Sequence, residues 1–231
     1  MNIRIAKYIS NSGYCSRRDA ERLVQDGRVK INNQDCSHPS RKVNNKDIIK
    51  INNKIIKIKN KVEIWKLYKP IKYICSTKDN LHRKKIFDLL PNNLSNLKSV
   101  GRLDFMSEGL ILLTNNGDYS RYLELPSTNL ERIYRVCVIN NVRSSDVKKV
   151  NGGIIIENIE YNKVKLLIEK KNKEYLWFVF KLSEGKNREI RNICKFFSWS
   201  VVKLIRISYG PYKLGNLKVG ELQKIKVINH D

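Results

Sequence analysis

The stretch from Val100 to Asp118 limits what this chain can fold into more than any other; it reads V-G-R-L-D-F-M-S-E-G-L-I-L-L-T-N-N-G-D. Gly101 and Gly109 bracket a polar loop that holds Arg102 and Asp104. A carboxylate on such a loop, with a cation two residues away, can be held rigidly and partly shielded from water. The simplest interpretation of Asp104 is a turn aspartate that accepts a hydrogen bond from a nearby backbone N–H.

The loop leads into a short apolar run, Gly109–Thr114. Such a run is too short for a stable helix and is typical of a buried strand. A turn follows it, and Asp118 is predicted to N-cap a helix over Tyr119–Leu125, which Pro126 ends. The loop that carries the carboxylate is therefore expected to be anchored in the core of a sheet.

The pattern G-R-L-D-x-x-[ST]-E-G-L-x-L-L-T-N-x-G-D runs through this stretch without a gap. It is similar to the catalytic signature of the ribosomal RNA pseudouridine synthases, namely type A of the small ribosomal subunit together with types B, E and F of the large one. In that family the aspartate of R-L-D is the catalytic nucleophile, a role that the resemblance gives to Asp104. Ser107 stands where threonine is common and keeps the hydroxyl group.

Two later motifs extend the resemblance. Tyr134, in R-I-Y-R-V, has an ordinary interpretation as a cross-strand packing residue, but the family pattern K/R-x-Y-R-V supplies a tyrosine that contacts the target base. In E-G-K-N-R-E-I-R the last arginine, Arg191, matches the family's partner of the catalytic aspartate. Glu189 stands where many members have glutamine and, with K-L-I-R-I-S-Y-G at 203–210, favours type B, which modifies large-subunit RNA. Asn192 replaces a common arginine and weakens that subtype assignment.

Residues 1–60 are predicted to form a separate small module of two helices followed by strands. The sequence S-R-R-D at Ser16–Asp19 is a capping-box pattern that opens the second helix, and Gly27 is suited to end it. Strands are expected over Arg28–Ile31 and Asp47–Ile58, with a turn at Asn32–Asn33. This order, centred on S-R-R-D-A-E-R-L-V-Q-D-G-R-V-K-I-N, resembles the S4 RNA-binding domain.

Basic side chains on this module are candidate RNA ligands, because phosphate contacts accumulate affinity. For any one of them a solvated surface charge is an equally good interpretation. The candidates on the module are Arg4, Lys7, Arg17, Arg18, Arg22 and Arg28. The first helix is predicted to place Ile3, Ala6, Tyr8 and Ile9 on its buried face and Arg4 and Lys7 on the other. Near the predicted site, Arg102 and Arg188 are expected to clamp the RNA backbone.

A second domain is expected over residues 62–231, after a short linker near Lys59–Val62. Strands are predicted at Ile64–Tyr68, Glu131–Val138 and Tyr175–Leu182, and residues 139–174 are interpreted as scaffold with a turn at Asn151–Gly153. At the end of the E-G-K-N-R-E-I-R motif a helix is predicted to bury Ile190, Ile193, Cys194 and Phe197, which follow i, i+3, i+4, i+7 spacing. The resemblance implies an α+β fold, an S4 domain followed by a catalytic domain on a mixed, mainly antiparallel sheet.

The formal net charge is +24, from 46 Lys and Arg against 22 Asp and Glu in 231 residues. Such a charge favours a polyanionic partner, either nucleic acid or an acidic membrane face. The chain is also rich in lysine, asparagine and isoleucine, a drift that an AT-rich genome produces without selection for binding. The positions of the arginines are therefore more informative than those of the lysines.

Five widely spaced cysteines, with no C-x-x-C, are interpreted as free thiols in a reducing cytosol, and no metal site is predicted. No apolar run approaches the roughly 18 residues of a membrane helix, and no nucleotide-binding loop is recognised. We expect a cytoplasmic monomer without cofactor.

The expected activity is isomerisation of a specific uridine in ribosomal RNA, with 23S favoured, after the base leaves its stack. A neighbouring guanidinium favours the ionised form of a carboxylate, which a dry pocket opposes. Two alternatives are a non-catalytic S4-type RNA-binding or ribosome-assembly factor, and the same chemistry on 16S RNA. The joint presence of Asp104, Tyr134 and Arg191 argues against the first.

Overall fold

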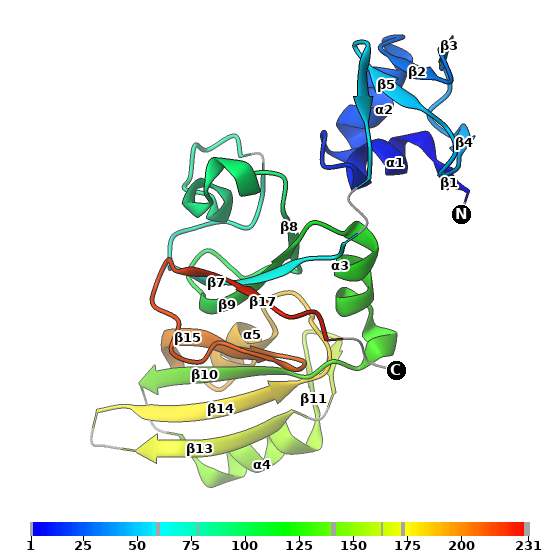
Figure 1. The fold of residues 1–231 in the computed structure, drawn as a ribbon. Helices are drawn as coiled ribbons and strands as arrows, with labels where there is room; N and C mark the ends of the chain where they lie inside the picture. The colour runs from blue at the N-terminus through cyan, green and yellow to red at the C-terminus, as the bar shows by residue number, and fades with distance from the viewer. Residues whose placement is uncertain are drawn as a thin grey trace. The chain divides into compact units, whose positions relative to one another are not determined.

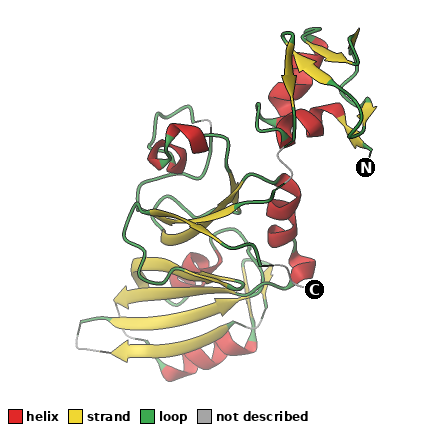
Figure 2. Cartoon of the chain, viewed as in Figure 1, coloured by secondary structure: helices red, strands yellow, loops and turns green. Residues whose placement is uncertain are grey.

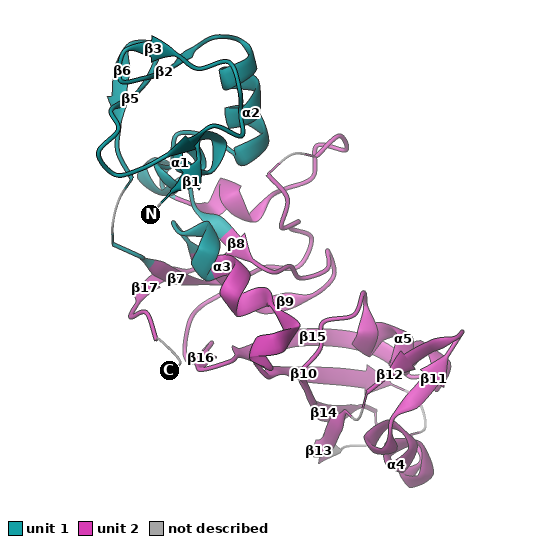
Figure 3. Ribbon diagram, turned by 90° about the vertical axis from the view of Figure 1, so that its right-hand side faces the viewer, with its two compact units in different colours: residues 1–63, 91–98, 114–119 teal, residues 64–90, 99–113, 120–231 magenta. Residues whose placement is uncertain are grey.

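The computed structural model describes residues 2–58, 61–77, 79–139, 142–162, 164–171 and 174–228. The chain divides into two compact units (Figure 3). The N-terminal unit comprises residues 1–63, 91–98 and 114–119, and the C-terminal unit comprises residues 64–90, 99–113 and 120–231. The N-terminal unit thus includes two short segments from later in the sequence. The domain boundary at residues 60–62 remains a prediction, since residues 59 and 60 of the expected linker lie outside the described part.

The N-terminal unit combines two helices with short strands (Figure 1). Its elements are β1 (Ile3–Arg4), α1 (Ile5–Asn11), α2 (Arg17–Gln25), β2 (Val29–Ile31), β3 (Gln34–Asp35), β4 (Lys42–Val43), β5 (Ile49–Ile51) and β6 (Lys54–Ile56). The strands form an antiparallel sheet in the order β3-β2-β5-β6 and a separate β1-β4 pair. The two helices, the strand after Gly27 and the turn at Asn32–Asn33 are confirmed, but the strand expected over Asp47–Ile58 is a hairpin of two strands, β5 and β6. At the start of the chain Ile3 and Arg4 do not join the helix, because they pair with Val43 and Lys42.

Both ends of α2 follow from its sequence. The Ser16 hydroxyl accepts a hydrogen bond from the Asp19 backbone N–H at 3.2 Å and donates to the Asp19 carboxylate. At the other end Gly27 has φ +67°, and its N–H bonds Val24 while that of Arg28 bonds Leu23. This pair of bonds is a Schellman motif, so the predicted start and stop of the helix are both confirmed.

Two asparagine pairs close the hairpins of this unit. Asn32–Asn33 joins β2 to β3 and Asn52–Asn53 joins β5 to β6, and all four residues have positive φ. Two-residue hairpin turns of type I′ need positive φ at both positions, and asparagine tolerates it better than most residues. Part of the chain's asparagine content therefore has a structural use.

The remainder of the chain is built on one large sheet with helices beside it (Figure 2). The strands of the large sheet are β7 (Ile64–Lys69), β8 (Lys98–Val100), β9 (Glu108–Thr114), β10 (Arg132–Ile139), β13 (Lys165–Lys171), β14 (Leu176–Leu182), β15 (Ser200–Tyr209), β16 (Tyr212–Lys213) and β17 (Leu222–Ile225), and β11 (Ile154–Ile156) and β12 (Ile159–Tyr161) form a separate antiparallel pair. The helices of this part of the chain are α3 (Gly117–Glu124), α4 (Ser144–Gly152) and α5 (Glu189–Phe196).

The sheet has the order β13-β14-β10-β15-β9-β7-β17, with β16 beside β15 and β8 beside β9. β10 pairs antiparallel with both β14 and β15, whereas β15 pairs parallel with β9. The sheet is thus mixed and mainly antiparallel, and with the helices it confirms the expected α+β class. Strand β9, buried along most of its length, lies inside this sheet as predicted.

Helix α5 covers one face of the sheet through the residues that its periodicity indicated. Ile190, Ile193 and Cys194 are buried, and Phe197 packs partly buried against the same cluster. Trp199, which follows the helix, stacks on Phe178 of β14 with ring centroids 5.3 Å apart. This packing fixes the position of α5 on the sheet, and it therefore also fixes the position of the first turn of the helix.

Two further local predictions are wrong. Asn116, not Asp118, caps α3, because its side-chain oxygen accepts the backbone N–H groups of Asp118 and Tyr119, both at 2.9 Å. The expected turn at Asn151–Gly153 is instead the end of helix α4, which packs on β13 as Asn151 exchanges two hydrogen bonds with the Leu166 backbone. Among the described residues, no helix combines the length and the apolar character needed to cross a membrane.

Candidate active site

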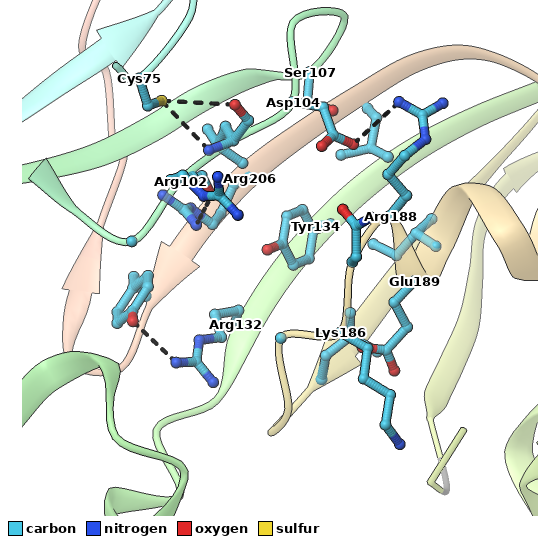
Figure 4. A pocket seen from close by; sticks show the side chains of 18 of the residues that line it. Cys75, Arg102, Asp104, Ser107, Arg132, Tyr134, Lys186, Arg188, Glu189 and Arg206 are labelled. Atoms are coloured by element: carbon cyan, nitrogen blue, oxygen red, sulfur yellow. Dashed lines mark hydrogen bonds and ion pairs between the residues drawn. The ribbon is translucent and has the colours of Figure 1, made fainter. Parts of the chain in front are cut away.

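The C-terminal unit contains a cavity of about 990 Å³ (Figure 4). It is lined by all three predicted catalytic residues and by both predicted backbone clamps. These are Asp104, Tyr134, Arg191, Arg102 and Arg188. They come from the loop before β9, from β10 and from the start of α5, so the fold gathers residues that are far apart in the sequence.

The loop that carries Asp104 depends on its two glycines. Gly101 has φ +65° and Gly109 has φ +102°, a region that L-residues with side chains rarely occupy. Gly109 lies opposite Arg206 in the parallel β9–β15 pair, and a Cβ there would be 2.4 Å from the Arg206 carbonyl oxygen. The chain can enter β9 this close to β15 only with glycine at position 109.

Residues 104–107 form a turn closed by a hydrogen bond from the Ser107 N–H to the Asp104 carbonyl at 3.1 Å. The turn is held on several sides. The Lys72 N–H donates to the Phe105 carbonyl at 2.7 Å, and the Lys69 ammonium donates to the Ser107 carbonyl at 2.7 Å. Among the described residues, the Asp104 carboxylate accepts no backbone hydrogen bond. The turn-aspartate interpretation therefore does not account for it.

Two arginines face the carboxylate instead. Arg191 Nε lies 3.7 Å from Asp104 Oδ2, and a terminal nitrogen of Arg188 lies 3.9 Å from the same oxygen. The Arg191 guanidinium also donates to the Met106 carbonyl at 2.8 Å and to the Ser107 hydroxyl at 3.3 Å. The hydroxyl retained at position 107 thus helps to orient the cation beside Asp104.

Tyr134 lies on β10, which pairs in regular register with β14 on one side. On the other side the β10–β15 pairing shifts register between Ile133 and Tyr134, which sets Tyr134 opposite Arg206. The extra residue of this bulge, Ile207, belongs to β15. The ring packs partly buried against the sheet cluster and also lines the cavity, so the packing and active-site interpretations both hold.

Two further arginines line the cavity that the sequence did not single out. Arg206 is 2% exposed and donates to the Leu110 carbonyl at 2.7 Å, and Arg132 is 7% exposed and donates to the Ser183 carbonyl at 2.7 Å. Their guanidinium carbons lie 5.0 and 4.8 Å from the centre of the Tyr209 ring. The sequence pattern that could have indicated Arg206 is its position two residues from both Leu204 and Ser208, because alternate residues of a strand share a face and these two are buried on β15.

Lys69, the last residue of β7, is completely buried below the loop that carries Asp104. Burial lowers the pKa of its ammonium group to about 8, and the nearby Asp104 and Cys75 partly oppose this shift. It donates to the Pro70 and Ser107 carbonyls at 3.0 and 2.7 Å. Lys69 therefore ties the end of β7 to the turn that carries Asp104.

Glu189 begins α5 and is 3% exposed. Burial, and after it the neighbouring Glu184 carboxylate, raises the pKa of Glu189 to about 8. The side chain is therefore largely protonated at neutral pH. Glutamine, the residue that is common at this position in the family, would have nearly the same shape and a permanently neutral head.

The basic residues predicted on the N-terminal unit do not share one helical face. Arg4 lies on β1, and Arg28 donates to the Asn52 side chain at 2.9 Å. Lys7 pairs with Asp118 at 2.7 Å within the same unit, so its charge is already partnered. The remaining three, Arg17, Arg18 and Arg22, all lie exposed on α2, where Arg17 pairs with Glu21 at 3.7 Å and Arg22 with Asp19 at 3.9 Å. None of the six is among the residues that line the cavity.

Within the described part of the chain, no group of three or more His, Cys, Asp and Glu side chains is placed to hold a metal ion. The five cysteines are free thiols, as predicted, and Cys36, Cys137 and Cys194 are buried. The lining of the cavity offers carboxylates and guanidinium groups. It is suited to a neutral or anionic ligand.

Comparison with known proteins matches both parts of the chain. The family model of RNA pseudouridylate synthase matches residues 63–196, and that of the S4 domain matches residues 3–49. An uncharacterised RNA pseudouridine synthase of Rickettsia typhi is 42% identical over 222 residues, which cover 96% of this chain and 91% of the relative.

Two further relatives are named ribosomal large subunit pseudouridine synthase B. The protein of Buchnera aphidicola is 34% identical over 97% of this chain and 93% of its own length, and that of Bacillus subtilis is 30% identical over 96% and 91%. A crystal structure of a pseudouridylate synthase superposes with a TM-score of 0.67 over 97% of this chain and 96% of that chain, at 24% identity, and shows the same fold. From these matches, along nearly its whole length, we conclude that this chain belongs to the RNA pseudouridylate synthase family and carries an S4 domain ahead of its catalytic domain.

Proposed function

We propose that the protein isomerises a specific uridine of 23S ribosomal RNA to pseudouridine and that Asp104 is its nucleophile. The observation that carries the proposal is the convergence of Asp104, Arg191 and Tyr134 on one cavity, from three separate motifs. The preference for 23S RNA is supported by the names of the Buchnera and Bacillus relatives.

The reaction replaces the N1–C1′ glycosidic bond of uridine by a C5–C1′ bond. It is an isomerisation, so the atoms of substrate and product are the same. Asp104 attacks the nucleoside or assists cleavage of its glycosidic bond. Arg191, 3.7 Å away, keeps positive charge beside the carboxylate while the base excludes water from the cavity.

The cavity also supplies groups to hold the base and its backbone. Tyr134 presents a partly buried aromatic ring on which uracil can stack. Arg188, whose side chain is 53% exposed, and the exposed Arg102 both line the cavity and would contact phosphates next to the base. The uridine must leave its stack to enter, which costs a few kcal/mol.

The S4 domain adds affinity by tethering the RNA to a second site on the same chain. Arg17, Arg18 and Arg22 on α2 are the best placed of its basic residues, because their side chains are exposed on a single helix. We propose that the enzyme acts as a monomer, without cofactor, on ribosomal RNA in the cytoplasm.

The test is to incubate the full-length protein separately with 23S and 16S RNA transcribed in vitro and to map pseudouridine by sequencing. The proposal expects one or a few modified positions in 23S RNA. Modification confined to 16S RNA would refute the preference for 23S. Binding of both RNAs with no product from either would favour a non-catalytic assembly factor.

A further inference from the structure

The turn at residues 104–107 has unusual residues at its centre. Its second and third positions are Phe105 and Met106. Turn centres are normally occupied by Gly, Pro, Asn, Asp or Ser, because these residues fit the backbone or hydrogen-bond to it locally. Two large apolar side chains at the centre of a turn go against these preferences, because neither fits the turn backbone especially well nor hydrogen-bonds to it. Such conflicts are expected at functional positions.

Neither side chain is used to build the core. Phe105 is 36% exposed and Met106 is 49% exposed. Their backbone carbonyls are pinned, that of Phe105 by the Lys72 N–H at 2.7 Å and that of Met106 by Arg191 at 2.8 Å. The turn therefore presents the two side chains to solvent from a rigid base, immediately beside Asp104.

The surroundings of this apolar pair are cationic. The Arg83 guanidinium lies 6.0 Å from the centre of the Phe105 ring, and Arg188 and Arg191 face the adjacent Asp104 carboxylate. Apolar side chains among arginines suit a partner that offers both flat bases and phosphates. Single strands and loops of RNA are bound in this way, through stacking and positive charge. Arg83 also pairs with Asp79 at 2.6 Å, so the excess positive charge of this site comes from Arg188 and Arg191, which lie beside a single carboxylate.

We propose that Phe105 and Met106 form an apolar wedge that stacks on the RNA bases next to the target uridine. The wedge occupies the space that the uridine leaves when it turns into the cavity. Side chains that insert between bases in this way lower the cost of unstacking. Since the wedge and Asp104 are neighbours in one turn, the same contact opens the RNA stack and brings the sugar to the carboxylate. This inference rests on the proposed function.

The experiment compares two RNA oligonucleotides that contain the uridine mapped in 23S RNA. One is a stem in which the uridine is paired, and the other is the same strand without its complement. The full-length double variant Phe105→Ala/Met106→Ala is expected to form pseudouridine on the order of 10-fold more slowly in the stem under single-turnover conditions. The rate on the unpaired strand should be nearly unchanged, because no stack has to be opened there.

Two matched variants separate stacking from damage to the loop. Phe105→Leu/Met106→Leu keeps apolar bulk and should recover most of the rate on the stem. Ile155→Ala removes an apolar side chain that is 67% exposed on β11 and should leave both rates at the wild-type values. Equal melting temperatures of all variants would show that the fold is intact.

A second readout follows the stack directly. In the Asp104→Asn background, 2-aminopurine in place of the mapped uridine in the stem should brighten when the enzyme binds, because the extruded base leaves its stack. The brightening should be largely lost when Phe105 and Met106 are alanine. Equal slowing on both RNAs, no slowing on either, or unchanged 2-aminopurine brightening overturns the wedge. An inactive wild type overturns the proposed function and with it this inference.

Discussion

Asp104 lies between two arginines without being held tightly by either. Its closest guanidinium nitrogens are at 3.7 and 3.9 Å, beyond the usual distance of an N–H···O hydrogen bond. Arg191 makes its short contact, at 2.8 Å, with the Met106 carbonyl. The carboxylate thus stays near positive charge yet keeps its lone pairs available. A nucleophile needs this combination, because a bidentate pair would compete with the substrate.

The structure predicts a large loss of activity for Arg191→Met. The substitution removes both the charge beside Asp104 and the hydrogen bonds that fix the loop, so the single-turnover rate should fall on the order of 10²-fold or more. Lys195→Ala, an exposed position on the same helix, is the control and should retain wild-type activity. A wild-type rate for Arg191→Met would show that the ion pair is not needed.

The raised pKa of Glu189 predicts an unusual pH dependence of the protein's stability. Its pKa in the folded protein is about 8, whereas an unfolded glutamate titrates near 4.3. Between these values the folded state holds a proton that the unfolded state has released. The contribution of Glu189 to stability is therefore fully present below about pH 4 and is lost as pH rises through about 8.

Glu189→Gln should remove this dependence. The melting temperature of the variant, relative to that of the wild type, should rise steadily between pH 5 and pH 8.5, as measured by calorimetry in matched buffers. Glu131→Gln, at an exposed carboxylate, should show no such trend. A constant difference between Glu189→Gln and wild type across this range would mean that Glu189 is ionised in the folded protein.

At the scale of elements, the sequence predicted those features that are encoded locally. The apolar run 109–114, the i, i+3, i+4, i+7 spacing from Ile190 and the caps of α2 each gave the right element. Helix α4 was missed because its nine residues contain only Val147 and Val150 as apolar positions, too few to show a period. Motif resemblance, not periodicity, indicated which residues would meet at the site.

Long-range pairing could not be derived from local pattern. The residues around Gly109 do not indicate that it will lie against Arg206, 97 positions later in the chain. The register shift beside Tyr134 likewise leaves no pattern in the sequence from which it could be predicted. Arg132 and Lys69 were overlooked for the same reason. Each looks like an ordinary charged residue at the end of a strand, and only the folded sheet buries it.

The β9–β15 contact predicts that Gly109→Ala is severely destabilising. The new Cβ would lie 2.4 Å from the Arg206 carbonyl oxygen, and alanine at φ +102° is itself strained. A loss of about 3 kcal/mol or more is expected in urea unfolding, together with poor activity. Gly152→Ala, with open space around its Cβ position, should change stability by less than about 1 kcal/mol. Normal stability of Gly109→Ala would mean that β9 and β15 are not in this register.

At the scale of the whole molecule, the charge of +24 raises the question of which cations bind RNA. Lysine-rich composition can arise by drift, whereas exposed arginines on one short helix are more specific. The two compact units divide the work of the proposed enzyme. In the proposed function, the arginines of α2 in the N-terminal unit would supply affinity for RNA, and the cavity of the C-terminal unit would hold the reacting base.

Neutralising Arg17, Arg18 and Arg22 to glutamine should weaken RNA binding and reduce its salt dependence. The slope of log K against log salt should decrease by up to about 0.9 for each phosphate that the variant no longer neutralises. The matched control changes three exposed lysines of the same unit, Lys42, Lys46 and Lys54, to glutamine. Equal effects of the two triple variants in a binding titration would show that the positive charge acts without a specific site.

The central claim concerns the carboxylate of Asp104. The most direct measurement is the amount of pseudouridine formed in 23S RNA by Asp104→Asn, at protein concentrations that saturate RNA binding. The variant keeps the shape of the side chain and removes its charge, so we predict near-normal affinity for RNA and no detectable pseudouridine. Product formation by Asp104→Asn at a rate within tenfold of the wild type would contradict the assignment of the nucleophile.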